Sequence, residues 1–181
     1  MKYLLFIFIL LLSLSAISQE VNLFQLEDKG ELKYLKGEAK PFTGRGIANF
    51  DNGKPSIINN YKDGKLEGLV TIYYQNGNKS MEVNYVGGKM NGLWAEWYEN
   101  GVKKNEVIYK DEYMNGHCTR WYENGKKKEE GEYIHCKENG VWTYWYENGQ
   151  MQSEGTYKEA EKTGKWVEWS KKGKIIKEIN Y

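Results

Sequence analysis

Short segments in which large apolar residues alternate with polar ones, each bounded by glycine, make up most of this chain. In residues 92–109, for example, Trp94 and Val107 are separated by charged residues, and Asn100-Gly101 stands between the two halves. Asn-Gly between two such segments is the strongest short-range signal of a β-hairpin. Helix is disfavoured because glycines interrupt the pattern and β-branched and aromatic residues dominate the intervals. The pattern therefore predicts an all-β chain of hairpins.

The hairpin pattern recurs with a fixed period of 24 residues, which indicates a repeat architecture. We expect an elongated, twisted antiparallel meander of six 24-residue hairpins within residues 41–181, with repeats that start at 44, 68, 92, 116, 140 and 164. Three columns of equivalent residues define the period: turn glycines at Gly53, Gly77, Gly101, Gly125, Gly149 and Gly173, strand glycines at Gly44, Gly68, Gly92, Gly116, Gly140 and Gly164, and tyrosines at Tyr61, Tyr85, Tyr109, Tyr133, Tyr157 and Tyr181.

Residues 1–18 predict a secretory signal peptide. Lys2 is followed by an apolar run, and Ala16 and Ser18 supply the small residues that precede a cleavage site before Gln19. The run is short for a transmembrane span, and an uncleaved membrane anchor is the alternative. We therefore expect an exported protein that is periplasmic, cell-surface or extracellular. Residues 19–40 are expected to form an N-terminal capping segment, with short strands on either side of a turn at Asp28-Lys29-Gly30.

If Asn100-Gly101 forms a two-residue type I′ turn, the residue numbers of any two facing residues in the third hairpin add up to 201. Gly92 would then face Tyr109, Trp94 would face Val107, and Tyr98 would face Lys103. We expect the Trp94/Tyr109 face to be the core, with an aromatic ring covering the strand glycine opposite it. Trp142 over Gly155 is expected to be a second example of this packing.

The opposite face carries one large aromatic residue per repeat and a matching row of glutamates. Equivalent rings in successive hairpins would lie about 10 Å apart. One interpretation is structural, with the rings packed under the stems of lysines such as Lys104 and Lys128. The other is a binding strip for a sugar, a peptide or the surface of a partner. The candidate ligand- or partner-binding residues are the aromatics Tyr73, Trp97, Trp121, Trp145 and Trp169, and the glutamates are Glu82, Glu106, Glu130, Glu154 and Glu178.

The charge balance and the lack of catalytic motifs narrow the range of possible functions. Removing the signal peptide deletes Lys2 and leaves 25 basic residues (26 minus 1) against 25 acidic ones, so we expect no nucleic-acid partner. The charge does not indicate membrane association, which stays open. The sequence shows no nucleophile–base motif, phosphate-binding loop or zinc spacing, so we expect no enzyme, cofactor or metal. The fourth hairpin alone breaks the symmetry of the columns. It holds His117, Cys118, His135 and Cys136, and a disulfide between its two cysteines stays open.

The motif G-x-W-x-x-W-Y-E-N-G-x-K-x-x-E-x-x-Y-x-x-G-x-x-N, seen from Gly92 and Gly140, resembles the MORN-repeat variant found in many bacterial proteins. The resemblance extends from Pro41 onward and implies a twisted array of β-hairpins. It also implies protein–protein contacts, and membrane or lipid association, rather than catalysis. Some members are labelled antitoxins of toxin–antitoxin systems. The chain departs from the pattern where the glycines of one turn, Gly64 and Gly88, become Glu112, Cys136 and Ala160, and the conformation of that turn stays open.

Together these features predict a non-catalytic exported repeat protein that presents an extended β surface to a protein partner or an envelope component. Glycan or cell-wall binding through the aromatic row is the first alternative, and antitoxin-like neutralisation of a partner protein is the second. Hydrolysis would have to use the fourth hairpin, because an active site needs residues unlike their counterparts in other repeats. The end strands of an open meander also allow self-association.

Overall fold

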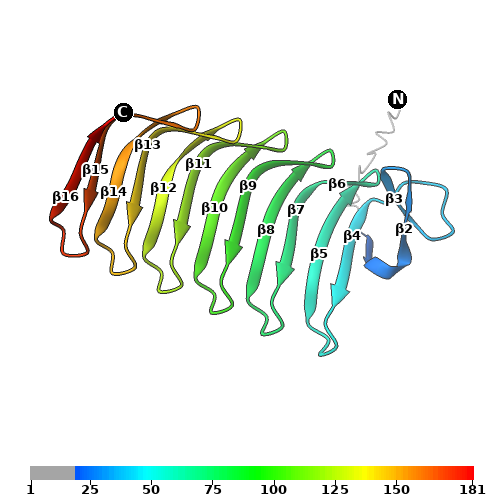
Figure 1. Cartoon of the computed structure of the whole chain (residues 1–181). Helices are drawn as coiled ribbons and strands as arrows, with labels where there is room; N and C mark the ends of the chain where they lie inside the picture. The colour runs from blue at the N-terminus through cyan, green and yellow to red at the C-terminus, as the bar shows by residue number, and fades with distance from the viewer. Residues whose placement is uncertain (1–18) are drawn as a thin grey trace, which may run out of the picture.

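The computed structural model describes residues 19–181, in which 14 strands form one sheet. From β4 onward the strands follow one another in chain order, except that the short β6 pairs with β5 beside β7, so the hairpins stand in a row from the N-terminal to the C-terminal end (Figure 1). The strands are β1 (Gln19–Asn22), β2 (Leu26–Lys29), β3 (Leu32–Leu35), β4 (Gly44–Asn49), β5 (Pro55–Lys62), β6 (Lys65–Leu66), β7 (Gly68–Tyr73), β8 (Lys79–Val86), β9 (Lys89–Trp97), β10 (Lys103–Lys110), β11 (Tyr113–Trp121), β12 (Lys127–Ile134), β13 (Lys137–Trp145), β14 (Met151–Lys158), β15 (Glu161–Trp169) and β16 (Ile175–Asn180).

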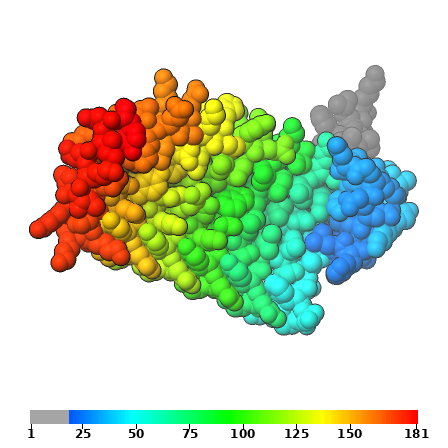
Figure 2. Space-filling model, viewed as in Figure 1, coloured from blue at the N-terminus to red at the C-terminus, as the bar shows by residue number. Residues whose placement is uncertain are grey.

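The predicted all-β meander of antiparallel hairpins is confirmed. The array within residues 44–181 consists of six hairpins: β4/β5, β7/β8, β9/β10, β11/β12, β13/β14 and β15/β16. Side chains fill the ribbon into one continuous elongated body (Figure 2). The expected signal peptide lies outside the described residues. In the described part of the chain, no helix is long and apolar enough to cross a membrane.

The segment before the first hairpin packs against the N-terminal end of the sheet. Strand β1 pairs in parallel with β4, while β2 and β3 form a separate two-stranded hairpin, joined to β1 by a one-turn 3-10 helix at Leu23–Gln25. Leu26, Phe42 and Tyr61 form a small buried core there. The backbone N–H of Lys33 also donates to the carbonyl oxygen of Gly64 at 2.9 Å. The first hairpin of the array is therefore covered by residues from the segment before it.

The Asn-Gly turns at the lower edge in Figure 1 differ from the expected type. Gly101 N–H donates to Tyr98 O at 2.9 Å, and Tyr98 N–H donates to Val102 O at 2.8 Å. Gly101 has a φ of 86°, but Asn100 does not have a positive φ. This is a three-residue loop with a type I turn followed by a bulged glycine, so the prediction of a two-residue type I′ turn was wrong. The Asn100 side chain stabilises the wider loop by accepting from Val102 N–H at 2.9 Å.

The two-residue turns with two positive φ angles lie at the upper edge instead. There φ is 48° at Asp111 and 72° at Glu112, which is the type I′ pattern. Three of these turns carry no glycine at all: Asp111-Glu112, His135-Cys136 and Glu159-Ala160. A left-handed conformation costs a non-glycine residue about 1–2 kcal/mol, so these turns are strained. Each turn is held by the preceding repeat, since Ala160 N–H donates to Glu138 O at 2.9 Å.

Replacing Ala160 with glycine should raise the free energy of unfolding by about 0.5–1 kcal/mol. Glycine has no Cβ to clash at a φ of 71°, and this gain exceeds the extra backbone entropy of the unfolded chain. Urea unfolding followed by tryptophan fluorescence measures the change. Ala95→Gly is the matched control and should destabilise by about 1 kcal/mol, because Ala95 is fully buried and has no positive φ. A loss of stability in Ala160→Gly would contradict the strain argument.

The column of strand glycines marks a bend in each hairpin. Gly92 has a φ of 110°, and the register with the preceding strand jumps from Val83↔Trp94 to Tyr85↔Met90, so four residues of β9 span two of β8. The register Gly92↔Tyr109 is as predicted, but the tyrosine ring does not cover the glycine. A Cβ built at Gly92 would meet Asn84, and one built at Gly140 would meet nothing within 4 Å. The expectation of ring-covered glycines was wrong for this column, which needs glycine for its backbone conformation.

The Trp94/Tyr109 face carries the main core of the array, as predicted. Val107, Cys118 and Trp142 are buried to 1–2% exposure, and Tyr133 joins them. Aromatic rings continue this core along the C-terminal repeats in mostly edge-to-face contacts, with centroids 5.1 Å apart for Tyr133 and Trp142 and 5.0 Å apart for Tyr157 and Trp166. These contacts join neighbouring repeats, which is how a stack of hairpins builds a continuous core.

Trp142 does cover a glycine in this core, but a different one from that expected. Its Cα partner is Gly155, as the register predicted, yet its ring lies over Gly131 of the preceding repeat. A Cβ at Gly131 would lie 2.3 Å from the indole, and Trp142 Nε1 donates to Glu132 O at 3.2 Å. Trp166 repeats the arrangement over Gly155. The prediction was wrong because these rings lean across the sheet instead of standing above their own partner.

Two side-chain ladders join successive repeats at the lower edge. Tyr98 Oη donates to Trp121 O at 2.8 Å, and Asn100 Nδ2 donates to Glu123 O at 3.2 Å. Each donor therefore bonds a carbonyl 23 residues further along the chain. Equivalent bonds run from Tyr74, Tyr122 and Tyr146 and from Asn52, Asn76, Asn124 and Asn148. The ladders explain why Tyr-x-Asn-Gly recurs in the motif.

Candidate functional site: the Trp97 face

The face opposite the core, called here the Trp97 face, is rearranged by the lower-edge bulge. The bulge pairs Lys103 with Trp97, so Lys103 lies on the Trp97 face. Lys104 lies on the core side, 3.6 Å from the Glu96 carboxylate and 5.9 Å from the Tyr98 ring centroid. The predicted Tyr98–Lys103 pair was therefore wrong, and so was the expectation that Lys104 and Lys128 cover the indoles. One extra residue in the loop shifts the following side chains to the other face.

The five predicted aromatics all lie on the Trp97 face, in five successive repeats, and all are half-buried. They therefore form a continuous row in which every ring is partly exposed. Beside the row lies a buried column of small residues, Thr71, Ala95, Thr119 and Thr143. Beyond that column the face exposes a mixed rim, with Leu69 and Ile108 37% exposed and Val141 59% exposed. Equivalent positions in other repeats hold the exposed polar residues His117, Glu132 and Lys165. Exposed apolar side chains bordered by polar ones are typical of contact surfaces.

Lysines and glutamates order the row in its N-terminal part. Lys103 Nζ lies 2.5 Å from the Glu106 carboxylate and 5.9 and 5.7 Å from the ring centroids of Trp97 and Trp121. Lys79 pairs with Glu82 at 2.5 Å and lies 5.6 Å from the Trp97 centroid. Cation–π and ion-pair contacts of this kind contribute about 0.5–1 kcal/mol each when they are exposed. Their main effect here is to hold the indoles in one orientation.

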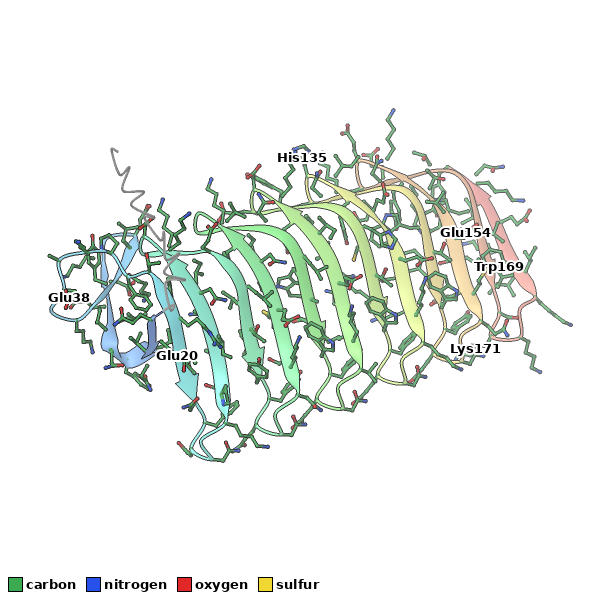
Figure 3. The ribbon with its side chains drawn as sticks, turned by 180° about the vertical axis from the view of Figure 1, so that it is seen from behind. Glu20, Glu38, His135, Glu154, Trp169 and Lys171 are labelled. Carbon is green, nitrogen blue, oxygen red and sulfur yellow. The ribbon has the colours of Figure 1, made fainter. Side chains whose placement is uncertain are left out.

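The row changes character in its C-terminal part. The position of Lys103 is taken by Met151 in β14 and by Ile175 in β16, which pair with Trp145 and Trp169. Trp145 is still contacted on one side by Lys127, whose ammonium lies 5.7 Å from the ring centroid. Figure 3 shows Trp169 and Glu154 near the C-terminal end of the sheet. The position that pairs with each indole is thus a lysine at Lys103 and Lys127 and apolar at Met151 and Ile175. Higher on the same face of the last hairpin, Lys165 and Glu178 form a separate ion pair at 2.9 Å.

The four unusual residues of the fourth hairpin do not form a common site. Cys118 is buried in the core, where desolvation raises the pKa of its thiol to about 11 and keeps it protonated. Cys136 is exposed at an upper-edge turn beside His135 (Figure 3), while His117 lies on the Trp97 face within 3.0 Å of the Thr119 hydroxyl. Within residues 19–181 the two cysteines form no disulfide, and no three His, Cys, Asp or Glu side chains form a metal-binding group.

A hollow within residues 19–181 lies away from the row of five aromatics. It has a volume of about 430 Å³ and is formed where the β2–β3 hairpin meets the upper turns, with Tyr61, Gly88 and Glu112 in its lining. The lining carries both acidic and basic side chains and no histidine or cysteine. The five aromatics line neither this hollow nor four others within residues 19–181, which suits contact with another large surface better than enclosure of a small molecule.

Sequence reasoning found the aromatic row but missed what supports it. The buried Thr71, Thr119 and Thr143 recur at the period of 24 residues, and so do Lys79, Lys103 and Lys127. Both columns were visible in the sequence, the first interrupted by Ala95 and the second followed by Met151 and Ile175. Placing Lys103 on the right face required the turn type, which the dipeptide Asn-Gly alone does not determine.

Comparison with known families agrees with this geometry. The family model of the MORN repeat variant matches residues 66–86, 90–111, 114–135, 138–159 and 162–181, together more than half of the chain. The matched segments follow the hairpins from β7 to β16. A comparison with curated proteins finds no match. The fixed period, the hairpin array and the matched repeats together show that the chain belongs to the MORN repeat variant family.

Proposed function

We propose that this chain is a non-catalytic, exported binding protein that presents the Trp97 face to a protein partner. The observation that carries the proposal is the continuous row of half-buried indoles beside the exposed rim of Leu69, Ile108 and Val141. Aromatic residues supply much of the binding energy at protein interfaces, and a row held by the backbone of one sheet loses little entropy on binding. The apolar run after Lys2 supports export.

Two features favour a protein partner over a glycan. A sugar stacks on a free ring face, whereas the ammonium groups of Lys79 and Lys103 both lie within 6 Å of the Trp97 centroid. The surface beside the row also carries both exposed aliphatic side chains and polar ones, a mixture that suits a protein surface. Titration with peptidoglycan fragments, followed by tryptophan fluorescence, separates the two candidates, and a saturable change would favour the glycan. Neutralisation of a partner in the manner of an antitoxin would be one form of the proposed binding.

Affinity capture from cell-envelope extracts tests the proposal when it is combined with a substitution on the face. Val141→Glu places a charge on the exposed rim and should reduce recovery of a stoichiometric partner at least tenfold, because a buried unpaired charge opposes docking. Phe24→Glu is the matched control, since Phe24 is 78% exposed and lies in the 3-10 helix Leu23–Gln25 before the first hairpin of the array, outside the Trp97 face. Thermal unfolding confirms that both variants are folded. Equal recovery by the two variants would refute the choice of face.

A further inference from the structure

Three repeats of the array share one arrangement on the Trp97 face. In each, a lysine at the start of a strand pairs with a glutamate three residues later: Lys79 with Glu82, Lys103 with Glu106, and Lys127 with Glu130. The lysine also lies over one or two indoles of the row, as Lys103 does between Trp97 and Trp121. In these three repeats, therefore, a lysine side chain occupies the space between a carboxylate and the neighbouring indoles.

The next repeat keeps the carboxylate and the rings but lacks the lysine. Met151 occupies its position, opposite Trp145. Glu154 accepts a hydrogen bond from the Thr143 hydroxyl at 3.1 Å, and no ion pair among residues 19–181 includes it. Glu154 pairs across the sheet with Val167, two residues before Trp169, so Glu154 and Trp169 lie on neighbouring strands of the same face (Figure 3). We call Trp145, Met151, Glu154 and Trp169 the unpaired-glutamate site.

We propose that the unpaired-glutamate site receives a lysine or arginine side chain from the protein partner. The inference rests on the proposed function and names the chemistry by which that face recognises its partner. A primary ammonium or guanidinium group would find a carboxylate and two aromatic rings there, the groups that bind Lys103 within the chain. Carboxylate pairing and cation–π attraction both favour such a group over a neutral one.

The shape of the surface favours a side chain of a protein over a free amine. Five hollows among residues 19–181 are lined by other residues, and none of them includes Trp145, Met151, Glu154 or Trp169. Exposed aliphatic side chains lie in the same part of the face, with Val141 59% and Ile175 57% exposed. A partner that covers these groups would also exclude water from the cation and strengthen its attraction to Glu154.

A small probe tests the site without the partner. The full chain is labelled with ¹⁵N and titrated with Nα-acetyl-lysine methylamide, while NMR follows the indole N–H signals of the seven tryptophans. We expect saturable shifts at Trp145 and Trp169, and unchanged signals from Trp97, whose surroundings are already occupied by two lysines. The neutral probe Nα-acetyl-norleucine methylamide, which keeps the four side-chain carbons of lysine and lacks the ammonium group, should bind at least tenfold more weakly.

Two pairs of variants locate the effect. Glu154→Gln should weaken binding of the lysine probe about tenfold, whereas Glu106→Gln should leave binding at Trp145 and Trp169 unchanged, because Glu106 belongs to another repeat. Met151→Lys should abolish binding by restoring the internal cation. Its control is Gln152→Lys, which adds the same charge at the exposed neighbouring position of the strand.

The inference is overturned if the lysine probe shifts all seven indoles equally, or if Glu154→Gln and Met151→Lys bind it as the unchanged chain does. Its failure can be told apart from failure of the proposed function. A captured partner that still binds Met151→Lys would refute the unpaired-glutamate site and leave partner binding intact. If the lysine probe binds selectively but Val141→Glu captures the partner as well as the unchanged chain does, the unpaired-glutamate site would stand and the proposed binding face would be refuted.

Discussion

Gly131→Val should lower the free energy of unfolding by about 3 kcal/mol. A Cβ at this position would lie 2.3 Å from the indole of Trp142, a rigid ring that is itself 1% exposed and has no room to move. Overpacking of a buried site costs about 1–3 kcal/mol, and a contact with a fixed aromatic ring belongs at the upper end of that range. Urea unfolding followed by circular dichroism measures the loss.

The chain supplies its own rescue of this substitution. In the preceding repeat the two equivalent positions hold Val107 and Cys118, which pack together in the buried core. Trp142→Cys alone should cost about 3–5 kcal/mol by leaving a cavity. The double variant Gly131→Val/Trp142→Cys copies the Val107–Cys118 pair and should recover at least 2 kcal/mol relative to the sum of the single losses. Additive losses would show that the two positions do not form one packing unit.

Trp166→Ala should lower the free energy of unfolding by about 3–5 kcal/mol, whereas Trp169→Ala, three residues later, should cost about 1 kcal/mol. Trp166 is 3% exposed, packs edge-on against Tyr157 with centroids 5.0 Å apart, and donates from its indole to Thr156 O at 3.2 Å. Trp169 is half-buried on the Trp97 face, and the bond that it accepts from Tyr146 uses its backbone oxygen, which alanine keeps.

The comparison tests which face of the sheet carries the stability. Both substitutions replace tryptophan with alanine in the same strand, so the loss of β-strand propensity is the same in the two variants. Urea unfolding of the two variants in parallel gives the result. Equal losses would mean that the Trp97 face is as much a core as the opposite face, and the proposed binding surface would lose its basis.

The sequence alone was sufficient for the architecture. Strict 24-residue spacing of glycines and tyrosines predicted the hairpin array, and the pairs Gly92–Tyr109 and Trp94–Val107 occur in the structure as expected. The assignment of the core face was also correct, because Val107 and Trp142 lie where side-chain alternation places them. These predictions depend on the period of two along a strand and on turn signals, which act over a few residues.

What the sequence missed depends on contacts between repeats. Asn-Gly is compatible with both a two-residue turn and a bulged three-residue loop, and the loop that forms places Lys103 beside Trp97. Glu112, Cys136 and Ala160 take left-handed conformations that their residue types do not favour, because hydrogen bonds to the preceding repeat hold them. The ring of Trp142 lies over Gly131 because it leans across the sheet, which no pairing rule for a single hairpin predicts.

The tyrosine and asparagine ladders also fix the spacing between successive repeats. Each Tyr Oη and Asn Nδ2 bonds the backbone of the following repeat in the same way, so the ladders hold successive hairpins at a constant interval. Two strand spacings set that interval at about 10 Å. A partner that engages more than one repeat must carry its contact groups at multiples of this distance. Gain or loss of one 24-residue copy would therefore change the length of partner that fits, without altering the chemistry of any single contact.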